Sequence, residues 1–275
     1  MALKARALAS NVTGFVRRAE SIDECRNARA VDDATVDLAS AVRDADLIVL
    51  CTPISRMRPL SKAMLPYLKK GAVITDVGSV KGELVQDLET IFASANAFFV
   101  GSHPMAGSEK TGVGSARPDL FEDAVCVITP TTRSQKPAVN KVARLWKSVG
   151  GKVIQLDPEA HDQSVSRSSH LPHVVAATLA NLVLDPKAPK AQAILCANGF
   201  RDTTRIASGS PEMWRDIALG NQRHIRQALT SFIRELERLN RAIGKGDAKY
   251  IENFLISAQA RRAKWRPSGA PDSTE

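Results

Sequence analysis

The chain has 275 residues, of which 44% are hydrophobic and 24% charged, so it is long enough for two domains with ordinary cores. Its formal net charge is +9, but lysine and arginine are scattered, aromatic residues make up only 5%, and no nucleic-acid-binding motif is present. We therefore expect the charge to attract small anions, such as a dinucleotide or a dicarboxylic acid, and expect no nucleic-acid partner.

The sequence also indicates a cellular location. No apolar run approaches the roughly 20 residues of a membrane span, and the first residues lack the apolar segment of a secretory signal. The four cysteines are far apart and form no C-x-x-C pair. Cys51 and Cys126 lie in apolar, strand-like runs, which is typical of buried thiols in a reducing compartment. These features predict a cytoplasmic protein with no membrane partner.

Helix and strand patterns alternate in the first part of the chain. We expect strands over residues 12–16, 46–53, 72–76, 97–101, 124–129 and 152–156. We expect helices over residues 1–9, 35–45, 54–70, 80–95 and 138–149, and a short one that a capping box of Ser21 and Glu24 begins. The apolar run at 46–53 is typical of a strand buried on both faces. The alternation predicts an α/β fold with a doubly wound, Rossmann-like parallel sheet.

The beginning of this sheet is unusual. Such a domain normally starts with a strand, a glycine-rich turn and then a helix. This sequence starts with the helical pattern, and its first 60 residues contain no G-x-G-x-x-G. We expect the sheet to lack its first strand and turn, whether through a wrongly chosen start, a fragment or genuine loss.

After residue 157 the strand patterns disappear. Helical patterns cover residues 159–184, 190–206, 211–244 and 247–265. One face of the third is apolar at helical spacing, through Leu229, Phe232, Ile233, Leu236 and Leu239. Periodicity alone leaves open whether this face is core within one subunit or pairs with a second copy. We expect a dinucleotide-binding domain over 1–157, a helical substrate and dimerisation domain over 158–266, and a solvated tail over 267–275.

A histidine follows one of the predicted strands, in the stretch F-V-G-S-H-P-M-A-G-S-E over residues 99–109. Pro104 keeps His103 in an extended conformation, and ligands collect at the carboxyl ends of parallel strands. A histidine there can transfer a proton near neutral pH. The alternative is a loop histidine with local hydrogen bonds, but polar clusters at other strand ends favour a role in chemistry.

Three of these clusters suit a dinucleotide. Ser79 lies between a strand and a helix, so it either faces the ligand edge or caps the helix. Arg17 and Arg18 follow a strand at the point where an acid holds the ribose of NAD and arginines accommodate the 2′-phosphate of NADP. They favour NADP, with NAD possible, although two solvated arginines are the alternative. Thr52 and Pro53 end another strand and complete the expected cofactor contacts.

Two further motifs lie in the helical part, S-H-L-P-H at 169–173 and N-G-F-R-D-T-T-R at 198–205. His170 and His173 have a spacing that zinc could use, but no cysteine or carboxylate lies at ligand spacing, so we expect no metal. Arginine suits bidentate binding of a carboxylate; the alternative is an exposed helix end on which Arg201 pairs with Asp202.

These motifs, in this order, resemble the prephenate/arogenate dehydrogenases of tyrosine biosynthesis. The resemblance covers residues 1–265 and rests on G-S-V-K, G-S-H-P-M-A-G-S-E, S-H-L-P-H, G-F-R-D-T-T-R-I-A and M-W-R-D together. It implies oxidative decarboxylation of prephenate or arogenate, with hydride transfer to NAD(P)+, by a homodimer formed through the helical domain. Asn198, where the family pattern often has glycine, and the missing glycine-rich turn depart from it.

The resemblance also implies roles for single residues. His103 is expected to be the catalytic base, and Ser79 to orient it beside the nicotinamide. Arg205 is expected to hold a substrate carboxylate. The remaining substrate-binding residues are expected to be Ser169, His173, Trp214 and Glu109.

Two other functions fit parts of the sequence. One is a catalytically impaired remnant that acts only as a dimeric binding protein, which the missing glycine-rich turn favours. The other is a dehydrogenase for 3-hydroxy acids, but such enzymes commonly use a lysine in the helical domain, where this sequence concentrates histidine and arginine. The sequence does not distinguish prephenate from arogenate.

Overall fold

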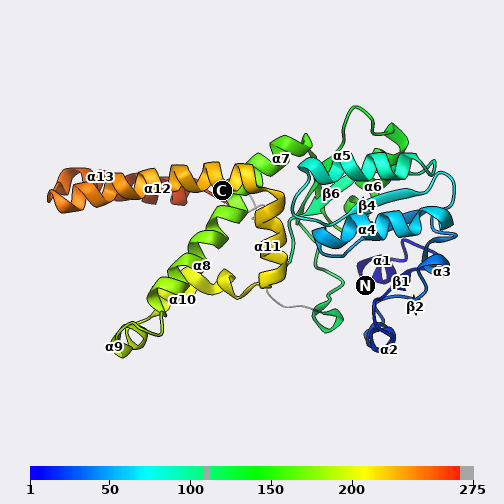
Figure 1. The fold of residues 1–275 in the computed structure, drawn as a ribbon, viewed down its shortest axis with the longest axis horizontal. Coiled ribbons are helices and arrows are strands. Elements are labelled where there is room, and N and C mark those ends of the chain that lie inside the picture. The colour runs from blue at the N-terminus through cyan, green and yellow to red at the C-terminus, as the bar shows by residue number, and fades with distance from the viewer. Residues whose placement is uncertain (108–111, 267–275) are drawn as a thin grey trace, which may run out of the picture.

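Figure 1 shows the chain as a computed structural model, which describes residues 1–107 and 112–266. Strands and helices alternate through the N-terminal part, and helices alone follow. The helical part extends away from the sheets, with two long helices running side by side as an arm (Figure 1). The Rossmann-like domain followed by a helical domain is thus confirmed. The expected tail lies outside the described residues.

Two small parallel sheets open the fold. In the first, β1 (Thr13–Phe15) pairs with β2 (Asp33–Thr35). In the second, the order is β3 (Leu47–Leu50), β4 (Val73–Asp76) and β5 (Phe98–Phe99), all parallel. No strand pairing joins β1 or β2 to β3 within the described part of the chain.

This separation explains why β3 is less buried than expected. Three of its four residues are only half-buried, whereas all four residues of β4 are buried. β4 has a partner on each side, but β3 pairs with β4 alone. The expectation that this run is buried on both faces is therefore wrong. Cys51, which directly follows β3, is exposed, whereas Cys126 is buried as expected.

The third sheet contains His103. Its first strand, β6 (Gly101–Pro104), is antiparallel to β7 (Val125–Thr129), and β7 is parallel to β8 (Lys152–Gln155). His103 lies opposite Val127 in the ladder, so it belongs to a strand and not to the loop after one. All four residues of β6 are buried. The ladder therefore fixes the backbone of His103.

The helices of the N-terminal part are α1 (Ala2–Ala5), α2 (Glu20–Asn27), α3 (Leu38–Val42), α4 (Ile54–Met64), α5 (Gly82–Ala93) and α6 (Lys136–Ser148). Single 3₁₀ turns lie at Leu65–Tyr67 and Val113–Ser115. The capping box predicted at Ser21 is wrong, because α2 begins one residue earlier and has no side-chain cap. The helix expected from residue 35 begins later, because Asp37 caps it by accepting from the N–H of Ala39. Thr35 belongs instead to β2, which the sequence analysis did not predict.

Two apolar clusters hold the helices against the sheets. Leu88 and Phe92 of α5 pack with Ile74 of β4 in one cluster. In the other, Trp146 of α6 packs with residues of β4 and β7 and donates a hydrogen bond of 2.9 Å to the buried hydroxyl of Ser102 in β6. Burying each such large side chain contributes about 1.5–3 kcal/mol. The two clusters hold β4 and β7, the neighbour of β6, against helices.

Every described element after residue 157 is helical. The order is α7 (Pro158–Val165), a π-helical turn (Ser166–His170), α8 (Leu171–Val183), α9 (Lys190–Ile194), α10 (Asn198–Thr204), a 3₁₀ turn (Arg205–Ser208), α11 (Pro211–Gly220), α12 (Gln222–Gly244) and α13 (Ala248–Lys264). Asp157 caps α7, with Pro158 at its first position. Among the described helices, none is both long and apolar enough to cross a membrane.

Candidate active site

The site is centred on a chain of three buried side chains. Nδ1 of His103 lies 2.9 Å from Nε2 of His161, and Nδ1 of His161 lies 2.7 Å from a carboxylate oxygen of Asp162. His103 comes from β6, whereas His161 and Asp162 come from α7. The two histidine rings meet edge to face, at 70°. The first helix of the helical part thus contacts the histidine of the sheet directly.

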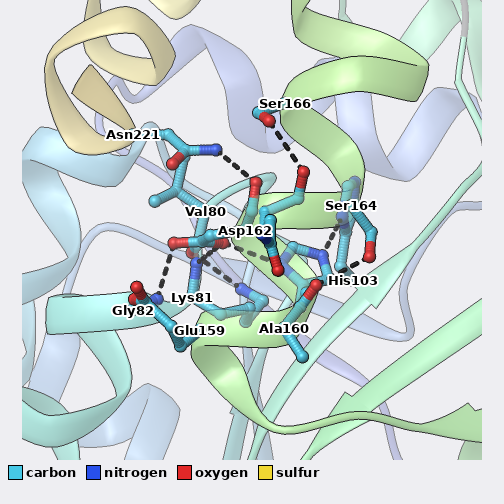
Figure 2. Close-up of polar contacts among 12 residues, drawn as sticks. Val80, Lys81, Gly82, His103, Glu159, Ala160, Asp162, Ser164, Ser166 and Asn221 are labelled. Atoms are coloured by element: carbon cyan, nitrogen blue, oxygen red, sulfur yellow. Dashed lines mark hydrogen bonds and ion pairs between the residues drawn. The ribbon is translucent and has the colours of Figure 1, made fainter. Parts of the chain in front are cut away.

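The Asp162 carboxylate lies at the beginning of α5. One of its oxygens accepts the backbone N–H of Lys81 at 2.8 Å, and the other accepts that of Gly82 at 2.8 Å (Figure 2). The N-terminus of a helix favours an anion, because its first N–H groups have no partner within the helix. A Cβ at Gly82 would lie 2.9 Å from the carboxylate, so only glycine allows this approach.

A buried ion pair lies next to the beginning of α5. The Lys81 ammonium and the Asp76 carboxylate are both fully buried and bonded to each other. Asp76 also accepts the N–H of Gly78 at 2.9 Å and that of Ser102 at 2.9 Å. The pair therefore connects the end of β4, the turn that contains Ser79, and β6.

The surroundings keep His103 neutral. Its pKa is lowered well below the usual value, first by burial and then by the positive charge of Lys81, with His161 and His170 adding to the shift. An imidazole without a proton at neutral pH can accept one from a substrate, so this environment suits a general base.

Asn221 and His170 form a second group of buried polar residues, which contacts α7. The side-chain amide of Asn221 donates to the backbone oxygen of Asp162 at 2.8 Å and lies 3.2 Å from Nδ1 of His170. Burial lowers the pKa of His170 to about 4. No group of three or more histidine, cysteine, aspartate or glutamate side chains within metal-binding reach occurs among the described residues.

An aromatic stack forms another part of the site. The ring of His173 lies parallel to that of Trp214, with centroids 3.4 Å apart. A Cβ on Gly209 would lie 2.7 Å from Nε1 of Trp214 and 3.3 Å from the His173 ring. Three segments, α8, α11 and the turn before α11, therefore pack closely at the stack. The structure brings together two of the five residues that were expected to bind the substrate, His173 and Trp214.

The remaining predicted substrate residues have different positions. Ser169 is half-buried in the π-helical turn, and Arg205 is exposed at the beginning of the 3₁₀ turn after α10. Ser79 is half-buried between β4 and α5, and its hydroxyl has no hydrogen bond to His103, which bonds to His161 instead. Glu109 lies outside the described residues.

The predicted cofactor residues lie where strands end. Arg17 and Arg18 are exposed directly after β1. Thr52 follows β3, and its buried hydroxyl has no hydrogen-bond partner in the described part of the chain. Pro53 is the N-cap residue of α4, whose first turn has no side-chain cap. An unpaired buried hydroxyl beside an uncapped helix N-terminus suits a phosphate-containing ligand, so these residues fit a nicotinamide dinucleotide.

Four residues of the site were not predicted from the sequence: His161, Asp162, Lys81 and Asp76. His161 and Asp162 form no recognisable motif with their neighbours in the sequence. The contact of His161 is with His103, which lies 58 positions earlier. The burial of Lys81 could not be predicted from the pattern of polar and apolar residues, because lysine is normally exposed. The one available signal was the position of His161 and Asp162 in the first helix of the second part.

Comparison with known proteins identifies the family of the chain from two domain models that together cover most of it. The model of the prephenate dehydrogenase nucleotide-binding domain matches residues 1–155, and that of the prephenate dehydrogenase dimerization domain matches residues 157–256. The cyclohexadienyl dehydrogenase of Zymomonas mobilis is 36% identical over 244 residues, covering 88% of this chain and 83% of its own length. The prephenate dehydrogenase of Bacillus subtilis is 35% identical over 238 residues, 84% of this chain but 63% of that longer protein.

Solved structures agree. Prephenate dehydrogenase from A. aeolicus, in complex with hydroxyphenyl propionate and NAD+, superposes with a TM-score of 0.89 at 33% identity, covering 95% of this chain and 91% of that one. Synechocystis arogenate dehydrogenase gives a TM-score of 0.79 at 29% identity, with coverage of 95% and 93%. With both domain models matched in order, the chain belongs to the prephenate dehydrogenase family.

Proposed function

We propose that the protein oxidatively decarboxylates prephenate, arogenate or both in tyrosine biosynthesis, with hydride transfer to a nicotinamide dinucleotide. The observation that carries this proposal is His103, a buried and neutral histidine where the two parts of the chain meet. Prephenate gives 4-hydroxyphenylpyruvate, and arogenate gives tyrosine. The remnant alternative is not favoured, because His103 is buried, His173 stacks on Trp214, and both domain models match.

His103 performs the proton transfer. Nε2 accepts the proton of the ring hydroxyl, and the electron pair of that O–H bond forms the C=O bond as hydride leaves the same carbon. The nicotinamide, when bound, accepts the hydride. The ring carboxylate then leaves as carbon dioxide, its bonding electrons make the ring aromatic, and the proton returns to the phenolic oxygen. Aromatisation supplies much of the driving force, so the protein mainly positions the substrate and deprotonates it.

The substrate residues are part of the same proposal. We assign a substrate carboxylate to Arg205, because a guanidinium binds a carboxylate through two parallel hydrogen bonds. We assign the ring to the neighbourhood of the His173–Trp214 stack. Ser169 and Glu109 complete the proposed pocket.

For the cofactor, we propose a preference for NADP. Arg17 and Arg18 follow β1 without an acid, and two guanidinium groups suit a 2′-phosphate. Thr52, Pro53 and Ser79 complete the proposed cofactor contacts. Replacing both arginines by serine is expected to lower kcat/KM with NADP+ by about 10–100-fold and to leave kcat/KM with NAD+ nearly unchanged. Equal losses with both cofactors contradict the preference.

We further propose a cytoplasmic homodimer with domains over residues 1–157 and 158–266. The match to a dimerization domain supports the dimer. Exposed apolar side chains on α12 and α13 support it too, among them Ile243, Leu255 and Ile256.

One assay tests the function. The purified chain is incubated with prephenate or arogenate and with NADP+ or NAD+, and reduced nicotinamide, carbon dioxide and the aromatic product are all measured. Equal amounts of the three products from one of the four mixtures support the proposal and identify the substrate and cofactor. The absence of turnover in all four mixtures overturns it.

A further inference from the structure

We propose that His161 and Asp162 are positioning residues that fix the tautomer of His103, so that its Nε2 is the nitrogen that accepts the substrate proton. The proposal deepens the proposed function, because it concerns the same base. It can nevertheless be tested without turnover, since the tautomer of an imidazole is a property of the protein alone.

The first step is the carboxylate of Asp162. Both of its oxygens accept backbone N–H groups at the beginning of α5, one from Lys81 and one from Gly82. A carboxylate in this position only accepts hydrogen bonds, and the helix N-terminus favours its negative charge. Nδ1 of His161, 2.7 Å away, must therefore be the nitrogen that carries hydrogen.

The second step follows from the first. In a neutral imidazole one nitrogen carries hydrogen and the other accepts. We take His161 to carry hydrogen on Nδ1 alone, so that it accepts at Nε2, which lies 2.9 Å from Nδ1 of His103. Nδ1 of His103 must then donate. The hydrogen of neutral His103 therefore lies on Nδ1, and Nε2 is left as the acceptor.

The arrangement also keeps its hydrogen bonds when the proton is transferred. When His103 gains a proton at Nε2, its Nδ1–H still donates to His161, and the Asp162 charge lies at the end of this chain. Lys81, His161 and His170 are the charged or titratable groups that shift the pKa of His103, and all three oppose its protonation. The Asp162 carboxylate is the anion at the far end of this hydrogen-bonded chain.

This geometry makes the base depend on both parts of the protein. His103 and the N-terminus of α5 belong to the sheet part, whereas Asp162 belongs to the first helix of the helical part (Figure 2). His161 directly precedes Asp162 in the same helix. The asparagine amide of Asn221 holds the backbone oxygen of Asp162 at 2.8 Å from a third direction, between α11 and α12. A shift between the parts changes the hydrogen bond of the base.

Nitrogen NMR on the full chain, labelled in histidine, reads the tautomers directly. The sequence contains only five histidines, and the signals lost in His103→Asn identify those of His103. We expect hydrogen on Nδ1 of His103 in the unsubstituted protein, and a shift to the Nε2–H form in His161→Phe. Hydrogen on Nε2 in the unsubstituted protein overturns the proposal, as does an unchanged His103 signal in His161→Phe.

Kinetics give a second readout. We expect His161→Phe to lower kcat by about 10²–10⁴-fold with little change in KM, because the base is misoriented while the binding residues remain. His161→Gln, whose amide can still accept from His103, is expected to restore part of kcat, and it serves as the test if the phenylalanine variant does not fold. A loss confined to KM, or a glutamine variant no better than phenylalanine, contradicts a positioning role.

His224→Gln is the matched control. His224 is also buried and contacts α7 through Glu159 at 3.0 Å, but it has no bond to His103 or His161. We expect it to change neither the His103 signals nor kcat. If the tautomer is as expected and the protein turns over no substrate, only the proposed function fails. If turnover is normal and the tautomer is reversed, only this inference fails.

Discussion

All five histidines of the chain are buried, and three of them have a lowered pKa. Burial is the main cause at His103, His170 and His173. Each therefore stays neutral in the folded protein at pH values where an unfolded histidine gains a proton. Protonating these histidines therefore costs free energy in the folded protein but not in the unfolded chain.

Stability should consequently fall with acid. Between pH 6.5 and about 4 the unfolded chain binds a proton at His170 that the folded chain does not, because its folded pKa is about 4. This one group therefore lowers the free energy of unfolding by about 1.4 kcal/mol per pH unit in that window, and has no effect above it. Urea unfolding at several pH values gives the free energy of unfolding at each pH. Between pH 6.5 and about 4, this free energy should change less steeply with pH in His170→Gln than in the unsubstituted protein. The same pH dependence in both proteins contradicts the low pKa of His170.

The close packing at Gly209 makes a second prediction at this scale. In Gly209→Ala the new methyl group would lie 2.7 Å from Trp214 and must displace it from His173. We expect about 1–3 kcal/mol lower stability and a raised KM for the substrate. Gly199→Ala is the control, since nothing lies within 4 Å of its Cβ position. Equal KM values in both variants would contradict the role of the stack.

Single residues also show where sequence reasoning ends. His103 was found because a strand pattern and Pro104 place it in extended backbone. His161 was not, because its importance comes from a contact 58 positions away. The orienting role of Ser79 stays a prediction, and the contact of His103 with His161 was not foreseen for the same reason: the sequence indicates which element carries a residue, but not which side chains touch.

At the scale of elements, a strand or helix was predicted correctly where its own residues show a clear apolar period. Most strands and helices were predicted from their apolar periodicity, including β4, α5 and α6. The three-residue β2 was missed because it has too few residues for a period. The burial of β3 was overestimated, since burial depends on which strands lie beside it and not on its own residues.

The buried pair of Lys81 and Asp76 gives a prediction for the β4–α5 connection. Lys81→Met leaves a carboxylate unpaired in the core and should lower the free energy of unfolding by about 3–5 kcal/mol. Adding Asp76→Asn removes that charge and should recover part of the loss, which a double-mutant cycle by urea unfolding measures. Lys69→Met, which breaks the exposed pair with Asp46, should have little effect. A Lys81→Met variant as stable as Lys69→Met contradicts the account.

At the scale of the whole molecule, the order of a sheet domain and a helical domain was predicted correctly, because one part alternates strand and helix patterns and the other does not. Periodicity left open whether the apolar face of the third helical pattern pairs within one chain. In the structure, Ile233 and Leu236 of that face remain 45% and 49% exposed, and no residue of α13 is buried. These exposed side chains are the surface we assign to the second copy.

This surface can be tested by changing its charge. We expect the double variant Leu255→Asp, Ile256→Asp to shift the protein from dimer to monomer, because two carboxylates would have to be buried in the interface. Light scattering after size-exclusion chromatography measures the mass. Val36→Asp, an exposed apolar position in the sheet part, should leave the dimer intact. A double variant that stays dimeric would place the interface elsewhere.

The role of His103 as the base can be tested on a single variant. The kcat of His103→Asn is measured beside that of the unsubstituted chain, with the substrate and cofactor pair that the assay identifies, and substrate binding is measured by calorimetry. We predict a kcat about 10²–10⁴-fold lower and an unchanged substrate affinity. A kcat within a few-fold of the unsubstituted value, with binding intact, would contradict the account.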